Sequence, residues 1–145
     1  MFYWWFLFRI DSKQLAAAIA DAESHTSGEI RIYVAHGKSL EPLTDAKTQF
    51  EKLGMTQTEQ RNGILFYIAP RSRNFAILGD TGIHAKCGPE FWQELAGMMA
   101  KSFHDGRLTE GLVSTVRRAG VLLSEHFPRA GDDKNELPNQ IERGV

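Results

Sequence analysis

The spacing of apolar residues divides the chain into stretches with helical periodicity and short runs typical of strands. A repeat of three to four residues is typical of an amphipathic helix, and a repeat of two, or a short continuous apolar run, is typical of a strand. The helical stretches are 12–25, 43–53, 89–105 and 109–126, and the strand-like runs are 29–34, 63–69 and 75–78. Residues 80–88 follow neither pattern clearly and are expected to be irregular or to form a short helix.

The strand-like runs differ in how deeply they should be buried. Ile30, Ile32 and Val34 alternate with polar or amphipathic residues, which is typical of a half-buried strand. The run 63–69 is almost continuously apolar and therefore predicts a central strand covered on both faces. The turn residues 70–74 then lead into 75–78, so these two runs are expected to form a hairpin.

This order of elements predicts an α/β fold with a single domain. A helix between the first two strands favours parallel pairing, while the hairpin adds an antiparallel strand. We therefore expect an α/β/α sandwich in which helices flank a small mixed β-sheet. The expected division is an aromatic arm over 1–11, the domain over 12–128 and a polar tail over 129–145, in which Leu137, Pro138 and Ile141 suggest packing against the domain.

Charge and cysteine content exclude several classes of protein. The 17 Lys and Arg are balanced by 18 Asp and Glu, so no excess of positive charge is available for nucleic acid. Cys87, the single cysteine of the 145 residues, cannot form an internal disulfide, and no Cys/His group has zinc spacing. A reducing compartment is therefore expected.

The N-terminal residues 1–8, MFYWWFLF, are unusually aromatic. They are too few for a transmembrane helix and lack the features of a signal peptide, so we expect a cytoplasmic protein, peripheral at a membrane at most. One interpretation is an arm that covers an edge of the core. The other is a contact site for a membrane interface or a protein partner, made by Tyr3, Trp4 and Trp5.

Acidic residues at the ends of the predicted elements are the first candidates for chemistry, because no familiar nucleophile or nucleotide motif is present. Glu29 opens the first strand, Asp80 follows the hairpin and Asp105 ends the third helix. If these carboxylates converge, they offer the oxygen ligands that calcium prefers. The alternative is that Asp80 simply caps a turn through backbone amides.

Arg61, just before the central strand, has two interpretations as well. Its planar guanidinium group could clamp a phosphate or carboxylate. Alternatively, Asn62 and Gly63 form a turn and Arg61 makes an ordinary surface ion pair.

Five short motifs together resemble the TPM domain family. They are TSGEIR at 26–31, RNGIL at 61–65, FAILGDTGI at 75–83, FHDGR at 103–107 and EGL at 110–112. The NELP tail at 135–138 is similar to the short bacterial branch, which lacks the signal peptide and membrane anchor of longer members. The resemblance implies an α/β/α sandwich and a calcium site with an acidic cluster at one end of the sheet. The family is also labelled a phosphatase, so the resemblance implies phosphatase activity as well.

The resemblance also implies which residues would bind the metal ion. Asp80 matches the motif after the hairpin, and Glu29 and Asp105 are the acidic residues of two other motifs. The leading expectation is a non-enzymatic regulatory or interaction module that binds a divalent cation, with calcium as the expected ion, and acts through protein or membrane-associated partners. A metal-assisted phosphatase with Arg61 as phosphate clamp is the first alternative. Recruitment to a membrane or protein partner through the aromatic N-terminus is the second.

Overall fold

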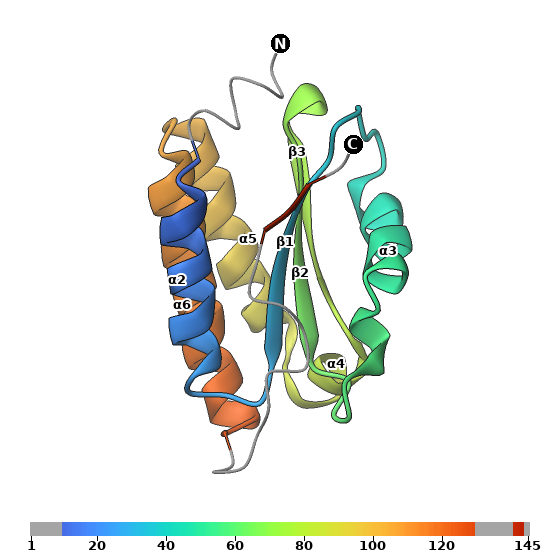
Figure 1. Ribbon diagram of the computed structural model, residues 1–145, viewed down its shortest axis with the longest axis vertical. Helices are drawn as coiled ribbons and strands as arrows, with labels where there is room; N and C mark the ends of the chain where they lie inside the picture. The colour runs from blue at the N-terminus through green and yellow to red at the C-terminus, as the bar shows by residue number, and fades with distance from the viewer. Residues whose placement is uncertain (1–9, 130–140, 144–145) are drawn as a thin grey trace.

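The computed structural model describes residues 10–129 and 141–143, which form three layers with the sheet in the middle (Figure 1). The helices are α2 (Ser12–Glu23), α3 (Pro42–Lys52), α4 (Thr81–Lys86), α5 (Pro89–His104) and α6 (Leu108–His126), with short 3-10 turns η1 (Met55–Gln57) and η2 (Pro70–Ser72). The strands are β1 (Glu29–Val34), β2 (Gly63–Ala69), β3 (Asn74–Gly79) and β4 (Ile141–Arg143). The predicted α/β/α sandwich is confirmed.

The four strands of the described residues lie in the order β3-β2-β1-β4. β1 and β2 are parallel, with Glu29 opposite Gly63, and β2 and β3 form the expected antiparallel hairpin. β1 and β2 therefore start at the same end of the sheet, here called the amino end, and run to the opposite end, here called the carboxyl end (Figure 1).

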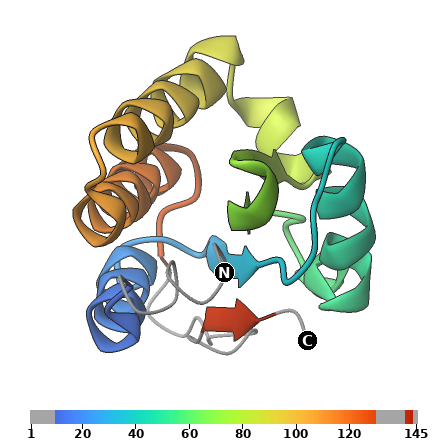
Figure 2. The ribbon, with the colours of Figure 1, turned by 90° about the horizontal axis from the view of Figure 1, so that it is seen from above.

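One face of the sheet carries the larger core, beneath α2, α5 and α6 (Figure 2). Leu15, Phe66 and Leu123 are among its fully buried side chains. α2 and α6 approach closely because Gly120 has no side chain, and a Cβ there would lie 2.6 Å from the Cβ of Ala22. Burial of this apolar surface is the main force that fixes the helices on the sheet.

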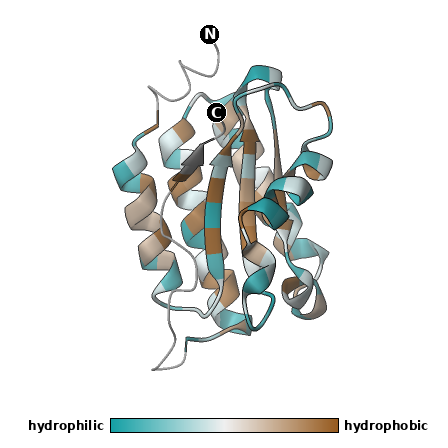
Figure 3. Ribbon diagram, turned by 45° about the vertical axis from the view of Figure 1, so that its right-hand side comes forward, coloured by the Kyte–Doolittle hydropathy of each residue, from teal (hydrophilic) through white to brown (hydrophobic). Residues whose placement is uncertain are grey.

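The opposite face carries a smaller core beneath α3. Phe50 and Met55 pack there against Leu65 and Tyr67 of β2. All residues of β2 are buried, as expected of a strand covered on both faces, and apolar residues run along the central strands (Figure 3). Thus a continuous apolar run in the sequence marked the centre of the fold.

One strand of the sheet has no clear signal in the sequence pattern. Ile141–Arg143 forms β4, which pairs in parallel with β1 from Ile32 to Val34. The tail therefore contributes a strand to the sheet, and Ile141, one of the residues that suggested packing against the domain, begins that strand. A three-residue strand has too few positions to show a repeat of two, which explains the omission.

Residues 1–9 of the predicted arm, which include Tyr3, Trp4 and Trp5, lie outside the described residues. Its proposed contacts with a membrane or partner therefore stay predictions, as do the domain boundaries. No helix within 10–129 and 141–143 is both long enough and apolar enough to cross a membrane.

Candidate functional site

Polar residues gather at the amino end of the sheet, where β1 and β2 begin and β3 ends. Glu29 opens β1, Arg61 and Asn62 precede β2, and Asp80 follows β3. The backbone ties these segments together, since the Glu29 N–H donates to the carbonyl of Asn62 and the Asp80 N–H donates to that of Gly63. The amino end is therefore the candidate functional site.

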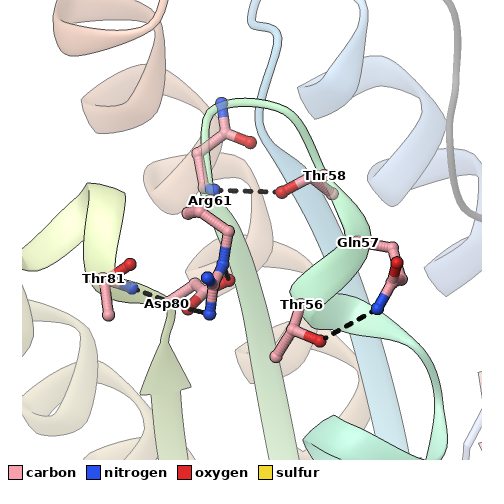
Figure 4. Close-up of polar contacts among 7 residues, drawn as sticks. Thr56, Gln57, Thr58, Arg61, Asp80 and Thr81 are labelled. Atoms are coloured by element: carbon pink, nitrogen blue, oxygen red, sulfur yellow. Dashed lines mark hydrogen bonds and ion pairs between the residues drawn. The ribbon is translucent and has the colours of Figure 1, made fainter.

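Arg61 and Asp80 form a two-pronged ion pair at this site (Figure 4). Nε and Nη2 of Arg61 donate to the two carboxylate oxygens of Asp80 at 2.6 and 2.9 Å. The Asp80 carboxylate also accepts the N–H of Thr81 at 2.7 Å, which caps α4. Asp80 raises the pKa of Arg61 through its hydrogen bond and its charge. The carboxylate, which is buried, is thus already supplied with donors.

The local backbone explains why these two residues meet. Arg61 has a φ of 51°, in the left-handed region that favours glycine, and this conformation turns the chain sharply into β2. The N–H of Gly82 donates to the Arg61 carbonyl at 2.8 Å. A Cβ on Gly82 would lie 2.0 Å from the carbonyl oxygen of Gln60, so only glycine fits against this turn.

In the structure, Arg61 forms an ion pair, which was the alternative to a phosphate clamp. Asp80 caps a turn, which was the alternative to a metal ligand. Both donor groups of Arg61 that face Asp80 are occupied, and Asp80 accepts three hydrogen bonds. Neither observation measures ligand binding, so the clamp and ligand roles stay predictions.

A second acidic group at the amino end is the pair Glu23 and Glu29, both almost completely buried. Oε2 of Glu23 accepts the N–H of Ile30 at 2.7 Å, while Oε1 is buried and has no hydrogen-bond donor among the described residues. Burial, followed by repulsion from the Glu29 carboxylate, raises the pKa of Glu23 from 4.5 to about 9. A proton on Glu23 can be shared with Glu29, which relieves the repulsion.

Arg129 lies close to this pair and partly offsets the effect of burial on the pKa of Glu23. It donates from Nη1 to the backbone carbonyl of Glu23 at 2.9 Å, and its charge lowers the pKa of the Glu23 carboxyl by less than burial raises it. Glu23 therefore has a strongly raised pKa beside a second buried carboxyl group, that of Glu29. Perturbed carboxyl groups of this kind are enriched at functional sites.

Glu29 was a predicted site residue, whereas Glu23 was not. Glu23 occupies an apolar position in the pattern of α2, on the buried face beside Ala22. A glutamate at a buried position of a helix is rare unless it is paired, so this mismatch was the available signal.

Asp105 lies at the other end of the molecule. It is the C-cap of α5, a helix of 16 residues that begins near the amino end, which separates the helix ends by about 24 Å. Its carboxylate, 43% exposed, lies 3.5 Å from Nδ1 of His104. Glu29, Asp80 and Asp105 therefore do not meet in one place. Across 10–129 and 141–143, no group of three or more His, Cys, Asp or Glu is placed to hold a metal ion.

Comparison with known proteins gives both a family and structural neighbours. The family model described as TPM domain matches residues 6–122. The NMR structure of BA42 protein from the psychrophilic bacterium Bizionia argentinensis is 36% identical, with a TM-score of 0.87 and 92% of each chain covered. No curated protein matches the chain.

A second solved structure shows the fold alone. The N-terminal domain of cg2496 protein from Corynebacterium glutamicum has a TM-score of 0.59 at 12% identity. The match covers 89% of this chain and 75% of the other.

Proposed function

This chain belongs to the TPM domain family, and we propose that it is a regulatory module that binds one calcium ion between Glu23 and Glu29. The observation that carries the proposal is the buried carboxyl pair, in which Oε1 of Glu23 has no donor among the described residues apart from a proton shared with Glu29. Two adjacent carboxylates in a buried place require a positive charge between them. A proton can fill that place, and so can a metal cation.

The chemistry of the pair suits calcium better than a transition metal. Carboxylate oxygens are hard ligands, and calcium accepts six to eight oxygens in flexible geometry, including backbone carbonyls and water. In this proposal the two glutamates supply the charged ligands, and neutral oxygens supply the remaining ones. Arg129, close to Glu23, would oppose the cation by its charge, so the affinity should be moderate.

The direct test is a calorimetric calcium titration of chelator-treated protein, with magnesium as competitor. We expect one site, with weak competition from magnesium because that ion dehydrates reluctantly. Glu23→Gln and Glu29→Gln should each weaken calcium binding at least tenfold. The glutamine at 23 retains an oxygen for the N–H of Ile30, so the local fold should persist.

Asp105→Asn is the matched control, because it removes a carboxylate at the opposite end of the molecule. Its calcium affinity should equal that of the wild type. Absence of any calcium binding would overturn the proposal. Binding that is lost in Asp105→Asn and retained in both glutamine variants would overturn it too.

The phosphatase alternative finds less support in the geometry. A phosphate clamp requires free donors on Arg61, and two of them are bound to Asp80. Hydrolysis of p-nitrophenyl phosphate with added metal ions, abolished in Arg61→Ala, is the result that would favour this alternative over a regulatory module.

A further inference from the structure

Two neighbouring segments at the carboxyl end of the sheet form an exposed surface that is separate from the candidate calcium site. They are the loop 36–41 between β1 and α3 and the turn 70–73 between β2 and β3, and both lie at the top of Figure 1. Ser39 joins them. Its N–H donates to Oγ of Ser72 at 2.9 Å, and its carbonyl accepts from Oγ of Ser72 and Nδ2 of Asn74 at 2.9 and 2.8 Å. The loop and the turn therefore lie side by side.

The loop is also fixed to α3. The hydroxyl of Ser39, a residue that is only 1% exposed, donates to Oδ2 of Asp45 in the first turn of that helix at 2.5 Å. The N–H, the carbonyl and the hydroxyl of one buried serine are thus all hydrogen-bonded. Because these bonds hold the backbone on either side of Ser39, Leu40 is held in its exposed position.

The most exposed part of this surface is apolar. Leu40 is 86% exposed, and Leu43, at the start of α3, is 49% exposed. Val121, on α6, is the third large apolar residue that stands out in this way among the described residues. A single exposed leucine is ordinary on a protein surface, but two within four residues beside a fixed loop favour contact with something apolar outside the molecule.

The charge around the two leucines is mainly positive. Lys38 and Arg71 are exposed, and neither forms an ion pair with another described residue. Glu41 is the only acidic residue in 36–41 and 70–73, although the whole chain has a formal net charge of −1. The acidic groups of the candidate calcium site lie at the amino end. The carboxyl end is therefore complementary to a negatively charged surface.

We propose that this end of the molecule docks on a lipid bilayer that contains anionic lipids. The docking surface consists of Leu40 and Leu43, which insert among the head groups, and of Lys38 and Arg71, which lie beside the lipid phosphates. Leucine gains free energy by leaving water for the bilayer interface, and the negative potential of anionic lipids attracts lysine and arginine. An apolar groove of a protein would accept the leucines but gives no role to the two cations. The proposed calcium site and this surface can each exist without the other.

The test is cosedimentation of the full chain with vesicles, in chelator so that calcium cannot bridge protein and lipid. One set of vesicles contains equal parts of phosphatidylglycerol and phosphatidylcholine, and the other contains phosphatidylcholine alone. Binding should be at least tenfold tighter to the anionic vesicles, and added salt should weaken it because salt screens exposed charges. Equal binding to both vesicles, or binding to neither, would overturn the proposal.

Leu40→Ser and Leu43→Ser test the inserted side chains. Each should weaken binding to anionic vesicles at least fivefold, because the apolar contact with the bilayer is lost. Val121→Ser is the matched control, since it removes an apolar side chain that is as exposed as Leu43 but lies in the second half of α6. Wild-type affinity in Leu40→Ser, or an equal loss in Val121→Ser, would contradict the proposal.

Lys38→Gln and Arg71→Gln test the cations. Each should weaken binding to anionic vesicles about fivefold and leave binding to phosphatidylcholine unchanged. Arg117→Gln is the matched control, because it removes an exposed positive charge from α6. A loss in Arg117→Gln as large as in the other two variants would show an effect of net charge alone and would overturn the assignment to this surface.

NMR of the full chain locates the contact directly. When anionic vesicles are added, the backbone amide signals of 36–43 and 70–73 should broaden before those of the other residues. In Leu40→Ser this broadening should need a higher lipid concentration. Broadening confined to other residues would place the contact elsewhere, and the proposal would fail.

Discussion

Arg61 and Arg73 stand at opposite ends of β2, and both have a positive φ. At the amino end, Arg61 is held by the buried carboxylate of Asp80 through two hydrogen bonds. At the carboxyl end, Arg73 lines an apolar cavity. The same residue in the same backbone conformation therefore has two different surroundings, and a strained arginine alone does not reveal its role.

The two ends differ in packing as well. At the amino end, backbone carbonyls lie so close to Gly82 that no side chain fits there. At the carboxyl end, the hairpin and the α5–α6 turn diverge and leave the cavity. We therefore expect substitutions in the tightly packed turn around Gly82 to lower folding stability more than substitutions at the carboxyl end.

The largest expected effect tests the tight packing at the amino end. Gly82→Ala places a Cβ 2.0 Å from the carbonyl oxygen of Gln60, so the backbone must move. We expect the free energy of unfolding in urea to fall by about 3 kcal/mol, the upper range for overpacking. Gly37→Ala is the control, since nothing lies within 4 Å of its new Cβ. Similar stability of the two variants would contradict the difference in packing.

The next prediction separates two aspartates that the sequence analysis placed in one set. Asp80→Ala removes the N-cap of α4, which costs up to about 2 kcal/mol, and the loss of the Arg61 contact adds to this. Asp105→Ala removes a half-exposed carboxylate and should change stability by less than about 0.5 kcal/mol. Urea unfolding followed by circular dichroism measures both. Equal losses would show that the two residues have similar structural roles.

The buried acidic pair predicts a pH dependence. Because the pKa of Glu23 rises from 4.5 to about 9 on folding, the folded protein keeps a proton that the unfolded chain loses. Its contribution to stability is complete below pH 4.5 and is lost as the pH rises towards 9. The slope is at most about 1.4 kcal/mol per pH unit for one proton.

Glu23→Gln should remove most of this slope, because the amide stays neutral and still accepts from the N–H of Ile30. Unfolding is measured in chelator at pH 6, 7 and 8, so that metal binding does not contribute. Glu110→Gln, at an exposed ion pair, is the control and should keep the wild-type slope. Parallel pH profiles for wild type and Glu23→Gln would exclude the buried proton.

The sequence predicted the fold well because its signals are local and repeated. The periodicity of α2, α5 and α6 and the continuous apolar run of β2 each extend over several residues. β4 was missed because three residues show no repeat, and its pairing with β1 depends on contacts distant in the chain.

The site was harder to predict because convergence is a property of three dimensions. Asp105 ends a helix and Asp80 follows a strand, and these positions looked equivalent in the sequence. The length of α5 separates them. Glu23 escaped notice because its position belongs to the apolar face of α2, where burial, not sequence motif, makes its carboxyl group unusual.

The smallest expected effect returns to the two arginines. Arg73→Gly relieves the left-handed backbone, but it makes the unfolded chain more flexible and removes the contacts of the side chain, so stability should change by less than about 1 kcal/mol. Arg61→Gly gains the same relief but removes two hydrogen bonds from a buried carboxylate, and its stability should fall further. Urea unfolding of both variants under one set of conditions gives the two changes. A larger fall in Arg61→Gly would show that the ion pair with Asp80 dominates there, whereas a fall of similar size in both would contradict the difference between the two ends of β2.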